Sequence, residues 1–352
     1  MFLNHDIMYQ ALLNKDSSYE GTFIVAVKTT NIFCRPTCTA RKPKKENVEF
    51  FTNSKDAILN GYRPCKICKP LETLGATPDF IQILLNKIIE NPNNKITDYN
   101  LFKQGIEPNK VRRWFKSNHG LTFQGYQRMM RINNAFHQLK KGDNVLGTAF
   151  DNGFDSVSGF TEAFKSILGK NPSHSKYVNI INAKRITTPI GPMLACADEN
   201  GICMLEFTDR RMLEFELKQI CNYLKAQIIY SESKYFPKLE AQLSDYFNGN
   251  LKKFELTLNT PGTEFQKLVW QKLCEIPYGE TRSYKQQSIL LNNPLAIRAV
   301  ARANGFNRIS IIIPCHRVIG EDGSLTGYGG GLPRKKWLLD FEKNNSDKKE
   351  LF

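Results

Sequence analysis

The sequence predicts a multidomain protein with α/β and all-α parts, and three observations support this prediction. The chain has 352 residues, more than a single hydrophobic core usually holds together. Residues 1–72 contain two close pairs of cysteines among short strand-like segments. Residues 79–178 repeat a helical pattern, and residues 183–260 alternate apolar and polar side chains before becoming helical.

Composition restricts the class of protein. Hydrophobic residues make up 41% of the chain and charged residues 24%, as in ordinary globular proteins. No apolar run approaches the ~18 residues of a membrane span, and Met1–Gln10 lacks the basic start and apolar core of a signal peptide. We therefore expect a cytoplasmic protein that does not enter a membrane. The nine cysteines, an odd number, fit a reducing compartment and favour metal-binding or catalytic roles.

The formal net charge is +15, and the basic excess is spread along the whole chain. Such a charge favours a polyanionic partner such as DNA. The chain is also rich in Lys, Asn and Ile, and this bias alone can raise the charge. The charge therefore permits nucleic-acid binding without locating it.

Four cysteines near the N-terminus have the spacing of a metal site. Cys34 and Cys38 form one pair, and Cys65 and Cys68 form another. Four thiolates paired in this way suit a closed tetrahedral zinc site that stabilises a small domain. On spacing alone, the expected role is one structural zinc ion with inert ligands. Two strands and a helix are expected around the pairs, over residues 22–30, 48–51 and 54–60.

The residues around these cysteines resemble the N-terminal domain of the Ada family. The shared motifs are Phe-Cys-Arg-Pro-x-Cys from Phe33 and Gly-Tyr-Arg-Pro-Cys-Lys-x-Cys from Gly61. The resemblance implies that Cys34 is both a zinc ligand and the acceptor of a methyl group from phosphotriesters in the DNA backbone. Methylation would remove one negative charge from the metal site, so DNA should then bind more tightly. The expected phosphate contacts are Arg35, Arg41, Lys42, Lys44, Lys45 and Arg63.

The next segment is predicted to contain two helix-turn-helix units joined by a long helix. Phe115-Lys116-Ser117 recurs as Phe164-Lys165-Ser166, and each copy ends a predicted recognition helix. The helices expected here cover residues 79–90, 100–104, from about 108, 123–140, 145–150 and from about 156.

The second unit resembles AraC-type regulators. The match covers Asp151-Asn152-Gly153-Phe154, Phe160, Phe164-Lys165 and Gly169-Lys170-Asn171-Pro172. The first unit departs from that pattern, because its opening helix is weakly apolar. Polar residues of the recognition helices could contact base edges or phosphates, or simply face solvent. The expected contacts are Asn109, Lys110, Arg112, Arg113, Lys116 and Ser156.

Residues 171–182 are expected to be a linker, and residues 183–260 a small lobe of sheet and helix. The strands and helices expected in this lobe cover residues 190–197, 202–207, 212–224 and 239–248. Four further cysteines lack metal spacing and are expected in the core: Cys196, Cys203, Cys221 and Cys274.

A cysteine near the C-terminus is the strongest catalytic candidate. Ile311–Ile313 is predicted to be a buried strand that ends at Pro314, because proline cannot donate to a strand ladder. The following turn presents Cys315 beside His316 and Arg317, whose positive charge should favour the thiolate. A free cysteine is more often a small buried hydrophobic residue. The neighbouring residues favour a nucleophile here.

A helix predicted after Pro333 provides an acid. Glu342 shares the apolar face of that helix with Leu338 and Leu339, so its carboxylate should be buried and require a partner. His316 is the nearest candidate, through a water. A cysteine, a base and a buried acid form the general pattern of an activated nucleophile.

These residues resemble the active site of O6-alkylguanine-DNA alkyltransferases. The match includes Pro-Cys-His-Arg-Val from Pro314, a Gly-Tyr pair at Gly327, the segment 276–284 and a helix over 294–304. The resemblance implies that Cys315 irreversibly accepts the methyl group of O6-methylguanine after the base has flipped out of the duplex. At Arg308 the family often has proline, a departure that leaves the preceding asparagine intact.

The same resemblance implies roles for the other residues. Glu342, acting through His316, would polarise a water that holds the thiolate, and Asn307 would brace the turn. Tyr284 would push on the phosphate during base flipping, and it or a nearby donor would protonate the departing guanine. Arg298 would fill the space left by the flipped nucleotide. The expected pocket residues are Val318, Tyr328, Gly329 and Gly330.

The four parts occur in the order that the Ada family shows. They are a zinc-bound α+β domain, an all-α AraC-type double helix-turn-helix domain, and an alkyltransferase with an α/β lobe and a helical catalytic lobe. Their expected boundaries are 1–74, 79–177, 183–260 and 261–345.

The order of the parts implies a DNA repair protein that becomes a transcriptional activator when Cys34 is methylated. The expected cofactor is one zinc ion, and the expected partners are double-stranded DNA and RNA polymerase. We expect a monomer that associates with the nucleoid. Two alternatives remain open: an AraC-type transcription factor stabilised by zinc but without phosphotriester repair, and a repair protein without promoter recognition.

Overall fold

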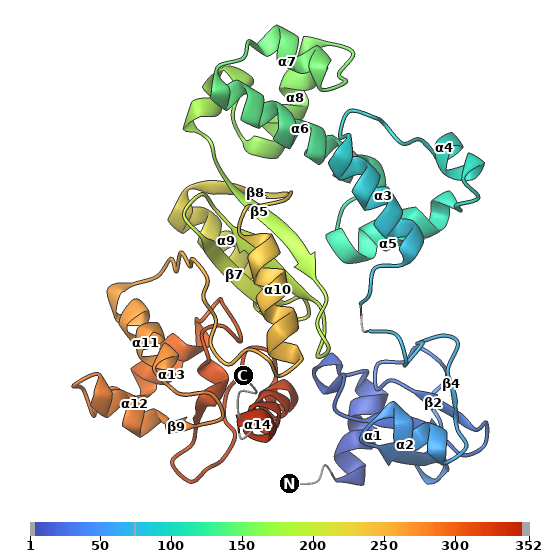
Figure 1. Ribbon diagram of the computed structural model, residues 1–352, viewed down its shortest axis with the longest axis vertical. Helices are drawn as coiled ribbons and strands as arrows, with labels where there is room; N and C mark the ends of the chain where they lie inside the picture. Colours follow the sequence, from blue (N-terminus) through green and yellow to red (C-terminus); the bar gives the residue numbers. More distant parts are fainter. Residues whose placement is uncertain (1–3, 74, 347–352) are drawn as a thin grey trace.

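The protein is described by a computed structural model that covers residues 4–73 and 75–346. The molecule is elongated, with a helical domain at one end, a sheet in the middle and two compact domains at the other end (Figure 1). The predicted arrangement of α/β and all-α parts is confirmed. Within the described ranges, no helix is long and apolar enough to cross a membrane.

The N-terminal domain is a four-stranded sheet with helices packed on it. Strand order is β3-β1-β2-β4, and only the β2–β4 pair is parallel. Phe23, Val25 and Val48 are buried against Leu12 of the first helix. The elements are α1 (His5–Asn14), the 3₁₀ turn η1 (Ser17–Tyr19), β1 (Ile24–Val27), β2 (Ile32–Cys34), η2 (Lys45–Asn47), β3 (Val48–Phe51), α2 (Ser54–Leu59) and β4 (Arg63–Pro64).

The helical domain consists of two units built around one long helix, as predicted. Phe123 and Met130 of this helix pack into the core of the first unit, whereas Ile132 and Phe136 pack into the core of the second. Each expected helix is present: α3 (Asp79–Glu90), α4 (Asp98–Lys103), α5 (Pro108–His119), α6 (Phe123–Lys141), α7 (Val145–Asp151) and α8 (Val157–Leu168).

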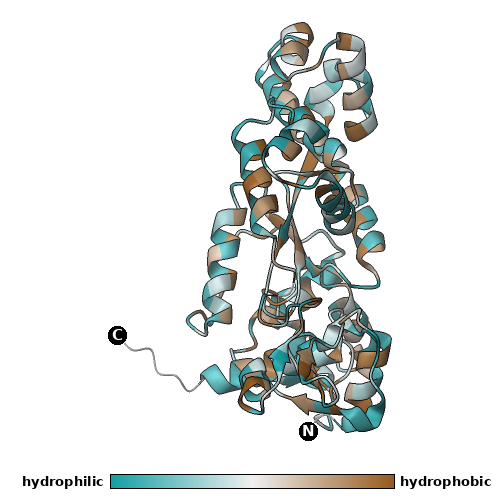
Figure 2. Cartoon of the chain, turned by 90° about the vertical axis from the view of Figure 1, so that its right-hand side faces the viewer, coloured by the Kyte–Doolittle hydropathy of each residue, from teal (hydrophilic) through white to brown (hydrophobic). Residues whose placement is uncertain are grey.

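The middle lobe is a mixed sheet with strand order β7-β6-β5-β8, in which β5 and β8 are parallel. Apolar residues concentrate in these central strands (Figure 2). The elements are η3 (Pro172–Tyr177), β5 (Asn179–Ile186), β6 (Met193–Ala197), β7 (Ile202–Phe207), α9 (Leu213–Leu224), β8 (Ala226–Tyr230) and α10 (Phe236–Phe247).

Two expectations for this lobe are wrong. Residues 171–182 are not a linker, because they form η3 and the first half of β5. Asn179 and Asn182 suggest a loop in the sequence, but pairing with strands on both sides outweighs their low strand propensity. Cys274 is exposed at the end of its helix rather than buried, whereas Cys196 and Cys203 are in the core as expected and Cys221 is half-buried.

The C-terminal lobe is mainly helical. Its predicted strand at Ile311–Ile313 is wrong, because Ile311 has a φ of 73° and the N–H of Ile313 donates to the carbonyl of Ile309 at 3.0 Å. The three side chains are buried as expected, but a buried turn produces the same apolar run as a strand. The elements are α11 (Glu264–Cys274), β9 (Arg282–Ser283), α12 (Tyr284–Leu290), α13 (Ile297–Gly305), η4 (Cys315–Arg317), β10 (Val318–Ile319) and α14 (Leu332–Ser346).

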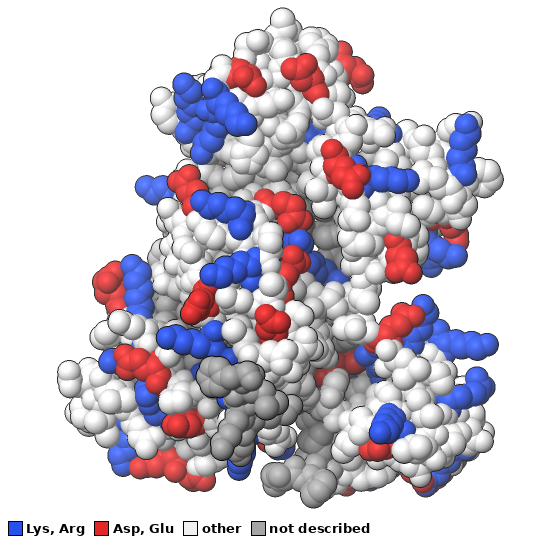
Figure 3. All heavy atoms as spheres, in the orientation of Figure 1, with Lys and Arg blue, Asp and Glu red and all other residues white. Residues whose placement is uncertain are grey.

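The parts are joined by packing as well as by the chain. Ile229 on β8 is fully buried in the same cluster as Phe136 of α6 and Phe164 of α8, so the helical domain and the sheet share a core. Arg334 of α14 donates to the carbonyl of Ser17 at 3.2 Å and thereby connects the C-terminal lobe to the N-terminal domain. On the face shown in Figure 3, basic and acidic side chains are interspersed rather than gathered in one patch.

Candidate functional sites

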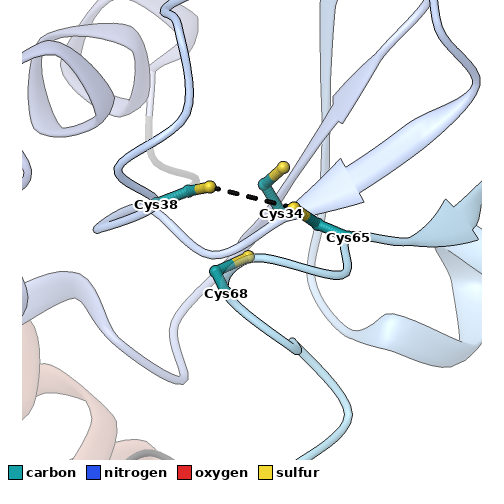
Figure 4. Close-up of side chains that lie close together, drawn as sticks. All are labelled: Cys34, Cys38, Cys65 and Cys68. Atoms are coloured by element: carbon teal, nitrogen blue, oxygen red, sulfur yellow. Dashed lines mark hydrogen bonds between the residues drawn. The ribbon is translucent and has the colours of Figure 1, made fainter. Parts of the chain in front are cut away.

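The first candidate site is the group of four cysteines. Cys34 ends β2, and the parallel pairing of β2 with β4 places Cys65 beside it, since the N–H of Cys65 donates to the carbonyl of Phe33 at 2.9 Å. Cys38 and Cys68 lie in the loops that follow. The four sulfur atoms all lie within 4.8 Å of one another, and those of Cys38 and Cys65 are 4.0 Å apart (Figure 4).

This arrangement fits a zinc ion. Tetrahedral coordination with Zn–S bonds of ~2.3 Å places sulfur atoms about 3.8 Å apart, close to the observed spacing. Backbone N–H groups of Arg35 and Ile67 each lie 3.4 Å from a sulfur, of Cys68 and Cys65 respectively. Such donors stabilise negative charge on metal-bound thiolates. The predicted metal ligands are therefore brought together.

Two of the residues predicted to contact phosphate, Arg35 and Arg63, lie in different surroundings. The Arg35 side chain is only 11% exposed, pairs with Glu20 and donates to the carbonyl of Cys68 at 3.0 Å. Arg63 is exposed on β4. Arg35 thus holds the loop of the fourth cysteine, and Arg63 is free to meet a ligand at the surface.

The second candidate site surrounds Cys315 on the 3₁₀ turn η4. The Asn307 Nδ2 donates to the Cys315 sulfur at 3.2 Å and to the carbonyl of Ile313 at 2.8 Å. Burial raises the pKa of the Cys315 thiol, and the Asn307 hydrogen bond only partly lowers it. The Arg210 and Lys335 cations also lower this pKa, so basic groups act on the thiol in the expected direction, but burial outweighs them. The Arg317 guanidinium is engaged by a carboxylate.

That carboxylate is Glu342, which is fully buried and accepts hydrogen bonds from several groups. Arg317 donates to both of its oxygens, at 2.8 and 2.9 Å, and the Tyr246 hydroxyl donates at 2.7 Å. The His316 Nε2 lies 2.9 Å from Oε1, so the expected water between this pair is not needed. Burial alone would raise the pKa of Glu342, but His316 and Arg317 lower it by a larger amount. The net pKa is below its ordinary value, so the carboxyl stays ionised.

His316 is positioned as a base. Burial lowers its pKa below the ordinary value, and the neighbouring Glu342 offsets this only in part. The imidazole is therefore neutral at pH 7, and its Nε2–H donates to the carboxylate. Its Nδ1 then carries a lone pair, and this atom is buried without a hydrogen-bond partner among the described residues.

Cys315 borders a cavity of about 700 Å³. Tyr284 and Arg298 line it from α12 and α13, and Tyr328 and Gly329 line it from the glycine-rich loop. A Lys335 ammonium group fixes that loop by donating to the carbonyl of Thr326 at 2.7 Å. Among the described residues, two of the expected pocket residues do not line the cavity: Val318, which is buried in the core, and Gly330, which packs on Phe207.

Two residues of this site, Tyr246 and Arg210, and the ion pair of Arg317 lie outside the sequence prediction. Arg317 was visible in the motif as a charge beside the nucleophile, but its ion pair with Glu342 depends on the fold. Tyr246 on α10 and Arg210 in the middle lobe come from distant segments without a recognisable motif. The Arg210 guanidinium lines the cavity and is held by the buried carboxylates of Glu206 and Glu216, each at 2.5 Å.

The predicted DNA contacts of the helical domain are accessible. Asn109, Lys110 and Arg113 are exposed on α5, and Ser156 is exposed at the N-terminus of α8, where its hydroxyl accepts from the N–H of Gly159 at 3.1 Å. Ser156 is therefore a helix cap as well as a candidate contact.

Removal of the Arg317 cation should destabilise the C-terminal lobe. Arg317→Met leaves the buried Glu342 short of two donors, and we expect the free energy of unfolding to fall by about 3–5 kcal/mol. Urea unfolding followed by fluorescence of Trp270 and Trp337 measures the change. Lys343→Met is the matched control. It removes an exposed cation from the residue that follows Glu342 on α14 and should change stability by less than about 0.5 kcal/mol. Equal losses in the two variants would contradict this role of the ion pair.

Comparison with known families matches four segments of the chain. The metal binding domain of Ada matches residues 7–71, and a helix-turn-helix domain matches residues 103–176. The ribonuclease-like domain of 6-O-methylguanine DNA methyltransferase matches residues 183–260, and its DNA binding domain matches residues 264–344.

Individual relatives agree with these matches. The chain is 33% identical to the bifunctional transcriptional activator/DNA repair enzyme Ada of Escherichia coli, over 98% of both chains. It is 47% identical to a methylated-DNA–protein-cysteine methyltransferase of Methanosarcina barkeri, over 46% of this chain and 96% of that one. The crystal structure of Mycobacterium tuberculosis O6-methylguanine methyltransferase superposes with a TM-score of 0.42 and 38% identity, covering 48% of this chain and 96% of that one. The chain belongs to the Ada family.

Proposed function

We propose that the protein repairs methylated DNA by two irreversible methyl transfers and activates transcription after one of them. The observation that carries the proposal is the cavity bordered by Cys315, behind which His316 forms a buried base paired with the ionised carboxylate of Glu342. The alkyltransferase and metal-binding matches support the same conclusion. We also propose that the boundaries 1–74, 79–177, 183–260 and 261–345 separate the four functional parts.

At the C-terminal site, Cys315 acts as the nucleophile. O6-methylguanine flips out of the duplex into the cavity, because its methyl group is inaccessible within the base stack. Arg298 fills the vacated space, and Tyr284 presses on the backbone.

The thiol proton passes to His316 Nδ1 through a water, and Glu342 stabilises the resulting imidazolium. The sulfur then forms a bond to the methyl carbon while the carbon–oxygen bond breaks. Tyr284 or a neighbouring donor protonates the guanine that leaves. A thioether is a poor leaving group, so each protein molecule reacts once.

At the N-terminal site, Cys34 accepts a methyl group from a backbone phosphotriester, whose phosphate diester is the leaving group. Cys34, Cys38, Cys65 and Cys68 would hold the zinc ion, which would keep the four sulfurs deprotonated while leaving them nucleophilic. Methylation of Cys34 reduces the charge of the site from two negative charges to one, and weaker repulsion of phosphate strengthens DNA binding. Arg63, exposed on β4, is the proposed phosphate contact, and Arg35 supports the site by holding the loop that carries Cys68.

The helical domain directs the methylated protein to promoters. Asn109, Lys110, Arg113 and Ser156 are its proposed DNA contacts, and RNA polymerase is the proposed partner at the promoter. We propose a monomer that works in the cytoplasm at the nucleoid. The exposed recognition helices α5 and α8 support this role.

Substitution of the proposed nucleophile tests the repair activity. With a duplex carrying a single O6-methylguanine, the wild-type protein should restore guanine in one stoichiometric turnover, and Cys315→Ala should restore none. Cys274→Ser is the control, because Cys274 is a free and exposed cysteine of the same lobe. Digestion with a methylation-sensitive nuclease gives the yield. Full repair by Cys315→Ala would exclude this thiol as the acceptor.

The pH dependence of methyl transfer tests the base. Burial and the Arg317 and Lys335 cations lower the pKa of His316, while Glu342 opposes them, and the net pKa lies below 6.5. The base is active when unprotonated, so the rate constant should hold as the pH falls toward 6.5 and decline below it. Rapid-quench single-turnover assays at saturating DNA measure the profile, and DNA affinity over the same range is the control. A fall of the rate constant at low pH with its midpoint above pH 6.5 would contradict the assignment of His316 as the base.

A further inference from the structure

Asn304 carries a buried amide that none of the described residues hydrogen-bonds. It lies near the end of α13, lines the Cys315 cavity and is 7% exposed. Both its Oδ1 and its Nδ2 are buried without a hydrogen-bond partner among the described residues. Asn307, one turn further on, uses both ends of its amide: Nδ2 donates to Cys315, and Oδ1 accepts from the N–H of Ile309 at 3.0 Å.

An amide in this position is held ready for a ligand. Buried polar groups in folded proteins almost always form hydrogen bonds, and a buried donor or acceptor without a hydrogen bond destabilises the fold. The end of α13 is fixed by Arg210, whose Nη2 donates to the carbonyl of Gly305 at 2.8 Å. Arg210 is itself held by Glu206 and Glu216, so the backbone next to Asn304 has little freedom to move.

The chemistry of the flipped base restricts what can pair with this amide. The base of O6-methylguanine has several acceptors, because methylation removes the proton from N1. Its only hydrogen-bond donor is the exocyclic amine at C2. The Asn304 Oδ1 can only accept, so this amine is the only group of the base that can satisfy it. The ring nitrogens on either side of the amine are acceptors and suit the Nδ2–H.

We propose that Asn304 determines base specificity by accepting a hydrogen bond from the 2-amino group and donating to an adjacent ring nitrogen. The proposal rests on the function proposed above. It implies discrimination against O4-methylthymine, whose base has no donor and would leave Oδ1 unpaired. A site built to hydrogen-bond a substrate amine rejects analogues that lack it.

The test compares two bases that differ only in the amine. Duplexes carry either O6-methylguanine or O6-methylhypoxanthine, and single-turnover rate constants are measured for transfer to Cys315. The wild-type protein should prefer the guanine derivative by about 10- to 100-fold. Asn304→Leu has a similar shape but no polar atoms, so it should slow the guanine reaction. With hypoxanthine the lost Nδ2–H hydrogen bond is offset by removal of the unpaired Oδ1, so that reaction should stay within about twofold. The preference of this variant should therefore disappear.

Two further variants separate recognition from folding. Asn304→Asp keeps an acceptor for the amine and should retain the preference, even if its charge slows both reactions. Arg302→Gln changes an exposed residue on the same helix and should keep the wild-type ratio. If Asn304→Leu slows both substrates equally, or keeps the wild-type preference, the inference fails while the repair function stands. If the wild-type protein transfers no methyl group from either base, the proposed function fails and this assignment fails with it.

Discussion

The buried Glu342 carboxylate is the interaction on which the C-terminal site depends. Its hydrogen-bond donors come from three separate segments: His316 and Arg317 on η4, Tyr246 on α10, and the backbone N–H of Gly279 at 3.3 Å. A buried carboxylate is tolerated only when such partners surround it. These partners fix the turn that carries Cys315, so the ion pair of Arg317 and Glu342 also places Cys315 at the cavity.

The two proposed acceptor cysteines lie in physically different surroundings. Cys34 belongs to a four-sulfur site, where bound zinc would hold its thiolate deprotonated. Cys315 belongs to no cluster of metal-ligating side chains among the described residues, and its burial favours the neutral thiol. A resting thiol reacts poorly with stray electrophiles or oxidants. The base behind it is needed only when a damaged nucleotide fills the cavity, which suits a protein that can react once.

The features that the sequence predicts well are those that depend on neighbouring residues. The cysteine spacing, the amphipathic helix at 79–90 and the repeated helical pattern all express local periodicity, and the structure contains each of them. The order of the four parts also followed from recognisable motifs.

The features that were missed depend on distant partners. The isoleucines at 311–313 are buried as expected, but their backbone forms a turn because of contacts made in the folded lobe. Strand β5 exists because two other strands pair with it despite its asparagines. Arg210 and Tyr246 could not be predicted for the same reason. Each is far in sequence from the residues that it contacts, and neither lies in a recognisable motif.

The most direct test of the account is peptide mass spectrometry of the zinc-loaded protein after mixing with DNA treated with a methylating agent. The account predicts one added methyl group on the peptide that contains Cys34 and one on the peptide that contains Cys315, with neither after untreated DNA. A methyl group on Cys315 alone would leave a repair protein with a structural zinc domain. Methyl groups on neither peptide would contradict the account.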